Sequence, residues 1–203
     1  MVENTTIVVQ KCLVRLHAGD ESARTDLINQ ACDRLQRLTR KLMGDFPRIR
    51  QWEDSGDVLQ DATIRLMRAL QEVSPRSPRE FFALAALQIR RQLLDLGRRF
   101  RGPQRRQLNE SARSDDSTGA GYELAAPAGF DANELAGWTD FHECIESLPV
   151  EQREVVGLLW YHGLTQVEAA EILNVTERSV KRYWQAARLR LHELMKDRGL
   201  LDD

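Results

Sequence analysis

The chain has 203 residues, 42% hydrophobic and 30% charged, which is enough apolar material for one modest core or two small ones. No apolar run approaches the roughly eighteen residues that a membrane span needs, and the first ten residues lack the layout of a signal peptide. We therefore expect a cytoplasmic protein with no membrane insertion. The three cysteines are odd in number and widely spaced, which argues against a disulfide framework or a zinc site.

Apolar residues at helical spacing predict four helices in the first half of the chain. The first two cover residues 9–19 and 27–44, and each ends at a glycine. The third covers residues 58–73. The fourth begins at residues 77–80, where a capping box coincides with a proline at the first helical position, and its apolar stripe continues over residues 81–96.

Residues 101–138 show no sustained helical period and are rich in small and polar residues, which predicts a flexible linker. The charge changes sign along this part of the chain. Residues 79–113 hold nine arginines and three acidic residues, whereas residues 114–147 hold eight acidic residues and no lysine or arginine. This basic-then-acidic pattern is typical of a protein that binds a polyanion with one part and keeps another part away from it.

The second half contains two helices separated by a short turn. Gly163 can end a preceding helix, and Thr165 with Glu168 forms a capping box that opens a short helix ending near Leu173. Asn174 suits a left-handed turn residue, and Thr176 can cap a further helix that runs to about residue 195. This spacing predicts a helix-turn-helix, the motif that places its second helix in the major groove of DNA.

The side chains of this predicted motif divide into an inner and an outer set. Ala170 is small where the two helices cross, and Val175 and Val180 are apolar where the second helix packs under the first. The outer set carries donors suited to base edges and phosphates. The candidate DNA-binding residues of this helix are Thr176, Arg178, Ser179, Lys181, Arg182, Gln185 and Arg188.

No period-two alternation appears in the sequence, so the fold class is predicted to be all-α. We expect two small helical modules, residues 1–100 and 139–198, joined by the flexible basic-then-acidic linker of residues 101–138. Asp57 and Asp61 lie one helical turn apart, but carboxylates near a helix start usually serve capping. His142 and Cys144 have no further ligands nearby and are interpreted as packing or surface residues. No catalytic residue, metal or cofactor is therefore indicated.

The segment 148–195, LPVEQREVVGLLWYHGLTQVEAAEILNVTERSVKRYWQAARLRLHELM, closely resembles the fourth conserved region of sigma-70 family factors, which binds the upstream promoter element. Asp57-Val58-Leu59-Gln60-Asp61, continuing to Leu70, resembles the second conserved region, which docks on RNA polymerase. With only these two regions and a linker, the chain is similar to the extracytoplasmic-function group of sigma factors. The resemblance implies RNA polymerase core enzyme and promoter DNA as partners, and allows an anti-sigma factor.

The resemblance also suggests roles for residues of the first module. Four residues on one side of the third predicted helix would bind the polymerase core: Asp57, Gln60, Asp61 and Arg65. The fourth helix would open the downstream promoter element, and its arginines offer a phosphate-binding track. These downstream DNA-binding candidates are Arg90, Arg91, Arg98, Arg99 and Arg101.

Two other classes of function compete with this hypothesis. A helix-turn-helix transcriptional regulator would share the DNA-reading motif but would act without stable binding to core polymerase; its receiver form needs alternating strands and helices, which the pattern does not show. An all-α phosphohydrolase or nuclease would need clusters of histidine and aspartate, and the four histidines are scattered. Stoichiometric co-purification with core polymerase separates the first hypothesis from both.

Overall fold

The computed structural model describes residues 5–45, 55–111 and 132–199, and within this part of the chain it contains helices and no strand. The all-α prediction is therefore confirmed. Of the described helices, none combines the length and the apolar character that crossing a membrane requires. Side chains are described except at residues 34–45, 55–59, 96, 97, 99–111, 132–136 and 138.

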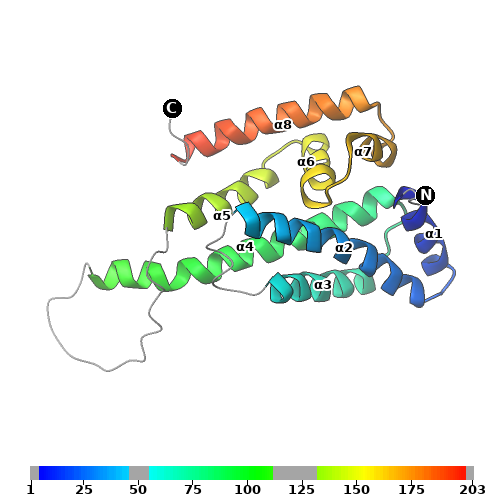
Figure 1. Cartoon of the computed structure of the whole chain (residues 1–203), viewed down its shortest axis with the longest axis horizontal. Coiled ribbons are helices and arrows are strands. Elements are labelled where there is room, and N and C mark those ends of the chain that lie inside the picture. Colours follow the sequence, from blue (N-terminus) through cyan, green and yellow to red (C-terminus); the bar gives the residue numbers. More distant parts are fainter. Residues whose placement is uncertain (1–4, 46–54, 112–131, 200–203) are drawn as a thin grey trace.

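Four helices form the first half, as predicted (Figure 1). They are α1 (Thr5–His17), α2 (Ser22–Asp45), α3 (Ser55–Glu72) and α4 (Pro78–Ser111). Helix α2 packs against both α1 and α3, and α4 packs against α3. Apolar residues at the predicted spacing, including Leu27, Leu66 and Phe81, are buried between them.

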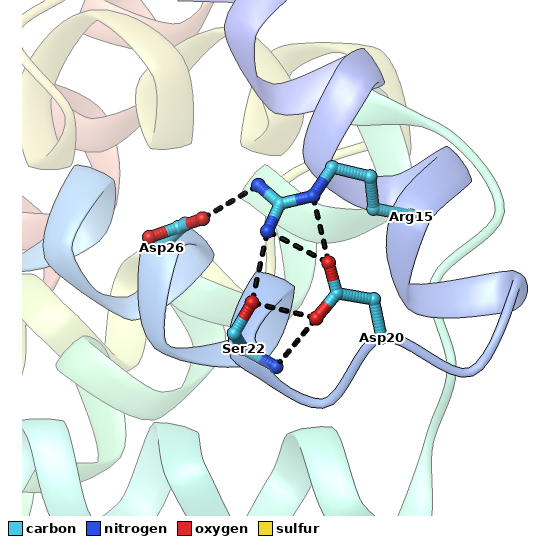
Figure 2. Close-up of polar contacts among 4 residues, drawn as sticks. All are labelled: Arg15, Asp20, Ser22 and Asp26. Carbon is cyan, nitrogen blue, oxygen red and sulfur yellow. Dashed lines mark hydrogen bonds and ion pairs between the residues drawn. The ribbon is translucent and has the colours of Figure 1, made fainter.

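The turn between α1 and α2 is held by a cluster of polar side chains around Arg15 (Figure 2). The Arg15 guanidinium donates to Asp20 at 2.9 Å, to Asp26 at 2.7 Å and to Ser22 at 2.9 Å. The hydrogen bonds from Ser22 and Arg15 lower the pKa of the Asp20 carboxyl. Asp20 also accepts from the Ser22 backbone N–H at 3.0 Å, so one carboxylate caps α2 while the arginine joins the two helices.

Helix α4 begins as predicted but is longer than predicted. The Ser77 hydroxyl accepts from the Glu80 backbone N–H at 3.3 Å, and the Glu80 carboxylate accepts from the N–H of Arg76 instead of Ser77. The helix continues past residue 100 to Ser111, so the first part of the predicted linker is helical. Residues 104–108 are glutamine, arginine and leucine, which favour helix and allow it to continue beyond Pro103.

The second half comprises α5 (Ala132–Glu146), α6 (Val150–Val156), the π-helical turn η2 (Gly157–Tyr161), α7 (Gln166–Leu173) and α8 (Glu177–Asp197). Helix α5 begins several residues before Phe141, where helical periodicity was expected to resume. The middle of the predicted linker, residues 112–131, lies outside the described residues. In Figure 1, α5 lies between α4 and α8, and both helices pack against it.

The two halves of the chain share their hydrophobic core. One cluster joins Leu13, Leu27 and Phe81 from the first half to Leu158 and Ala169 from the second. Another joins residues of α4 to residues of α5, η2 and α8, and its members include Ala86, Ile89, Leu93, Ile145, Tyr161 and Leu191. Burying side chains of this size contributes about 1.5–3 kcal/mol each, so the packing between the halves stabilises the structure described here.

Candidate nucleic-acid interface

The turn between α7 and α8 has the geometry that the sequence predicted. Thr165 caps α7 through a full capping box: its hydroxyl accepts from the Glu168 N–H at 3.2 Å, and the Glu168 carboxylate accepts from the Thr165 N–H at 2.8 Å. Asn174 ends α7 in the left-handed region with φ 54°. The Thr176 hydroxyl then accepts from the Ser179 N–H at 3.2 Å and caps α8. The two helices thus form a helix-turn-helix.

The inner face of α8 is packed as predicted, with one exception. Val180, Ala187 and Leu191 are buried, and Ala170 is buried where α7 approaches α8. Val175 was expected to pack under α7, but it is 37% exposed. Its backbone explains the difference, because the Val175 N–H donates to the Ala170 carbonyl at 3.0 Å and closes the turn, and this holds the residue at the surface.

The outer face of α8 carries the predicted cations and amide at the surface. Arg178, Lys181, Arg182, Gln185 and Arg188 are exposed. The Lys181 ammonium pairs with Glu177 at 2.9 Å. The Arg182 guanidinium lies 5.2 Å from the centre of the Tyr183 ring.

Two further residues of the predicted set, Thr176 and Ser179, hold the start of α8 together. Their hydroxyls lie 3.0 Å apart, and Ser179 is half-buried. They therefore fix where the exposed side chains begin along the helix.

The arginines of α4 are placed very differently. The Arg90 side chain is only 7% exposed and donates to the Glu146 carboxylate of α5 at 2.9 Å. Arg98 is 64% exposed and lies 3.9 Å from Asp95 and 4.0 Å from Glu143. Arg91 is exposed, while the side chains of Arg99 and Arg101 lie outside the described residues. Part of the predicted downstream track is thus covered by α5 in this structure.

The predicted polymerase-docking residues lie on α3. Gln60 is exposed, whereas Asp61 and Arg65 are half-buried and contact α4. The Asp61 carboxylate accepts from the Gln92 side-chain amide at 3.0 Å, and Arg65 donates to Asp95 at 2.6 Å. Asp57 is part of α3, but its side chain lies outside the described residues. Ala62 and Leu66 are buried on the opposite side of the helix, as predicted.

Contacts between the two halves include residues that the sequence analysis did not single out. Arg79 donates twice to the Glu154 carboxylate, with both distances 2.8 Å, and these hydrogen bonds raise the pKa of Arg79. The His162 Nε2 lies 2.9 Å from the Phe82 carbonyl oxygen. A cleft of about 470 Å³ lies beside these contacts, between α4 and the segment from α6 to η2. The partners are 75 and 80 residues apart, so no local pattern could have paired them.

His142 belongs to an aromatic cluster in the second half. Its Nδ1 lies 2.8 Å from the Tyr161 hydroxyl, and its ring centre is 5.5 Å from that of Trp160. Burial, followed by the nearby charge of Arg90, lowers the pKa of His142 to about 3. Of the two roles that the sequence left open for His142 and Cys144, packing or surface, the structure shows packing, since both are buried. Among the described residues no group of three or more histidine, cysteine, aspartate or glutamate side chains is arranged to hold a metal ion.

Comparison with known proteins gives three results. A family model described as "ECF sigma factor" matches residues 7–197 of the chain. Among solved structures, the chain is similar to the sigma factor RpoE of Bartonella quintana, crystallised in complex with the anti-sigma factor NepR, at 22% identity and a TM-score of 0.29. That match covers 79% of this chain and 98% of the other. No curated protein sequence matched the chain.

Proposed function

Because the chain belongs to the ECF sigma factor family, we propose that it directs core RNA polymerase to specific promoters and starts transcription there. The observation that best supports this proposal is the helix-turn-helix of α7 and α8, with a buried apolar side and an exposed basic side. The family is not a class of enzymes, and the protein would act non-covalently, in the cytoplasm, without a cofactor.

We assign the reading of the upstream element to α8. Helices in this motif insert their N-terminal turns into the major groove, where arginine recognises guanine and glutamine recognises adenine. Arg182 and Gln185 are exposed within the first three turns of α8, which suits contacts with base edges. Arg188 lies further along the helix and suits a phosphate contact.

We assign polymerase docking to α3 and downstream-element binding to α4. In this proposal Asp57, Gln60, Asp61 and Arg65 contact the polymerase. The arginines of α4 hold the phosphates of the opened strand. Residues 1–100 and 139–198 would act as separate modules on the polymerase, joined by residues 101–138. An anti-sigma factor as a further partner stays a prediction.

Transcription with purified core polymerase tests the proposal. The chain is added to core enzyme and a genomic DNA library, and transcript starts are mapped. We expect a defined set of start sites that share an upstream and a downstream motif. If the chain neither binds core polymerase nor produces start sites, the helix-turn-helix regulator that works without polymerase becomes the better hypothesis.

A charge reversal on α3 tests the docking assignment directly. Asp61→Lys should reduce binding to core polymerase by at least about tenfold, because it places a positive charge where a negatively charged side chain is proposed to contact the polymerase. Glu72→Lys is the matched control, since Glu72 is exposed at the end of the same helix and lies outside the proposed face. Equal losses in a pull-down with both variants would contradict the assignment.

A further inference from the structure

We propose that α5 competes with promoter DNA inside the free protein, by placing the carboxylate of Glu146 on Arg90 of α4 and that of Glu143, which also accepts from Arg198 at 3.3 Å, near Arg98. The inference rests on the proposed function, which gives the arginines of α4 to the downstream element. It adds a regulatory role to α5, whose residues fall partly in the predicted linker and partly in the predicted C-terminal module. The closed arrangement would allow DNA to reach α4 only after α5 and the C-terminal module have moved away.

The contact between Arg90 and Glu146 resembles the one that a phosphate would make. A carboxylate and a phosphate both present paired oxygens to the planar guanidinium group, so one can take the place of the other. In the closed structure the Nη2 of Arg90 donates to Glu146 at 2.9 Å, whereas its buried Nε has no hydrogen-bond partner. Glu146 therefore satisfies Arg90 only in part, and a phosphate with more oxygens could replace it.

A second arginine of α4 faces the same acidic helix. Arg98 lies 4.0 Å from Glu143, which is one turn before Glu146 on α5. Both carboxylates come from the segment of residues 114–147, which has eight acidic residues and no lysine or arginine. The acidic stretch thus places carboxylates beside two arginines of the basic stretch, Arg90 and Arg98, within one molecule.

Apolar packing holds α5 against α4. Ala86, Ile89 and Leu93 of α4 lie in one buried cluster with Ile145 of α5. Helix α4 also approaches η2 closely, since a Cβ built on Gly157 would lie 3.4 Å from the Cβ of Ala86. Beside this contact lies the cleft of about 470 Å³.

The closed arrangement leaves part of each of the other two proposed surfaces exposed. Gln60 on α3 is exposed, and α3 lies on the side of α4 away from α8 (Figure 1). The cations of α8 also face solvent. In this arrangement α3 can dock on polymerase while Arg90 of α4 is still covered by α5. This predicts an order of events in which binding to polymerase precedes contact between α4 and DNA.

A disulfide between α4 and η2 would lock the closed arrangement. Ala86→Cys with Gly157→Cys places two Cβ atoms close to the separation of about 3.5–4.5 Å that a disulfide needs. The single-cysteine variants control for pairing with the native cysteines. Failure of this disulfide to form under mild oxidation would show that the free protein is not closed, and would overturn the proposal.

DNA binding by the locked protein is the main readout. The probe is a fluorescent single-stranded DNA of mixed sequence and roughly 20 nucleotides, because phosphate contacts do not depend on sequence. All chains carry Arg182→Ala and Arg188→Ala, so that binding by α8 is weakened. We expect the oxidised double-cysteine variant to bind this DNA at least about tenfold more weakly than the same protein after reduction. Equal binding before and after reduction would overturn the proposal.

A carboxylate substitution isolates the role of Glu146. In the same background Glu146→Gln should tighten DNA binding by up to about tenfold, because it removes a charge-assisted bond that competes for Arg90. Glu21→Gln is the matched control: it changes the net charge equally, and Glu21 pairs with Arg24 on α2. Equal tightening by both variants would mean that net charge alone is responsible, and would overturn the proposal.

Binding to core polymerase separates this inference from the proposed function. The oxidised pair should still be retained by core polymerase through α3, and reduction should then allow transcription. If the unmodified protein does not bind polymerase, the proposed function fails. If it binds and the oxidised pair transcribes as well as the reduced protein, only the competition by α5 is wrong.

Discussion

Helices α4 and α8 are both basic and are both assigned to DNA, yet the fold treats them in opposite ways. The arginine of α4 that faces α5 is buried against a glutamate, whereas the cations of α8 are exposed. Helix α8 buries one side against its own half of the chain and leaves the other side to solvent. Helix α4 packs against both halves. Under the proposed assignment of both helices to DNA, this difference would let access of DNA to each helix be controlled separately.

Acid should have the largest effect, because His142 is buried on α5, the helix that packs against both α4 and α8. Burial and the charge of Arg90 hold its pKa at about 3, against 6.5 in an exposed histidine. The neutral form is favoured in the folded protein, so this contribution to stability is complete above about pH 6.5 and is lost as the pH falls toward 3. Between about pH 7 and pH 4 the free energy of unfolding should fall by about 3 kcal/mol from this group.

Denaturant unfolding followed by tryptophan fluorescence measures this loss, since one of the four tryptophans, Trp160, is in ring contact with His142. His142→Gln should make the stability less sensitive to pH over the same range. His192→Gln is the control, because His192 is exposed on α8. An unchanged pH dependence in His142→Gln would show that other groups cause the loss.

A bulky residue at Gly157 should uncover α4 without touching α8. Gly157→Leu should cost about 2 kcal/mol, because the added side chain meets Ala86 at a tight contact. It should also raise the affinity for single-stranded DNA, the same change that is expected of Glu146→Gln. Gly137→Leu on α5 is the control, since a Cβ there meets no atom within 4 Å. Thermal unfolding measures the change in stability, and fluorescence anisotropy measures the change in DNA binding. Equal results for Gly157→Leu and Gly137→Leu would contradict this prediction.

Alanine substitution of each proposed base-reading residue of α8 should change base preference at a single promoter position. Arg182→Ala and Gln185→Ala should each cost more than about 1 kcal/mol at one promoter position and relax the preference there, because a lost bidentate contact is specific to a base. Selection of upstream elements from a randomised promoter pool measures the change. If both variants return the wild-type motif, these residues do not face the groove.

The smallest effect is expected at Arg188. Arg188→Ala should weaken binding to all promoters alike and reduce the salt dependence by about one unit of slope, as for a phosphate contact. Titration at several salt concentrations measures the slope. A change of sequence preference in this variant would instead assign Arg188 to base recognition.

Local patterns predicted much of the C-terminal half. The capping box at Thr165, the left-handed turn at Asn174 and the cap at Thr176 all depend on residues a few positions apart, so the sequence contains their geometry. The exposure of Val175 was not predicted, because it depends on which atom of the turn forms a hydrogen bond.

The coverage of α4 could not be predicted from local patterns. Its contact between Arg90 and Glu146 joins residues 56 positions apart, and helical periodicity says only that a face is apolar, not which helix will cover it. The length of α4 was underestimated because residues 101–138 show no sustained apolar period, although the arginine and glutamine residues at 104–107 favour helix.

The π-helical turn η2 sets the rotational phase of everything that follows it. A π turn holds about one residue more than an α turn, so it is the structure that a single inserted residue leaves in an α-helix. Removing one residue from Gly157–Tyr161 would restore regular winding and rotate the next segment by about 100° around the helix axis. His162 would then turn away from the Phe82 carbonyl, while the cap at Thr165, which is formed locally, would survive. The alignment of the helix-turn-helix with the rest of the protein thus depends on one additional residue in η2.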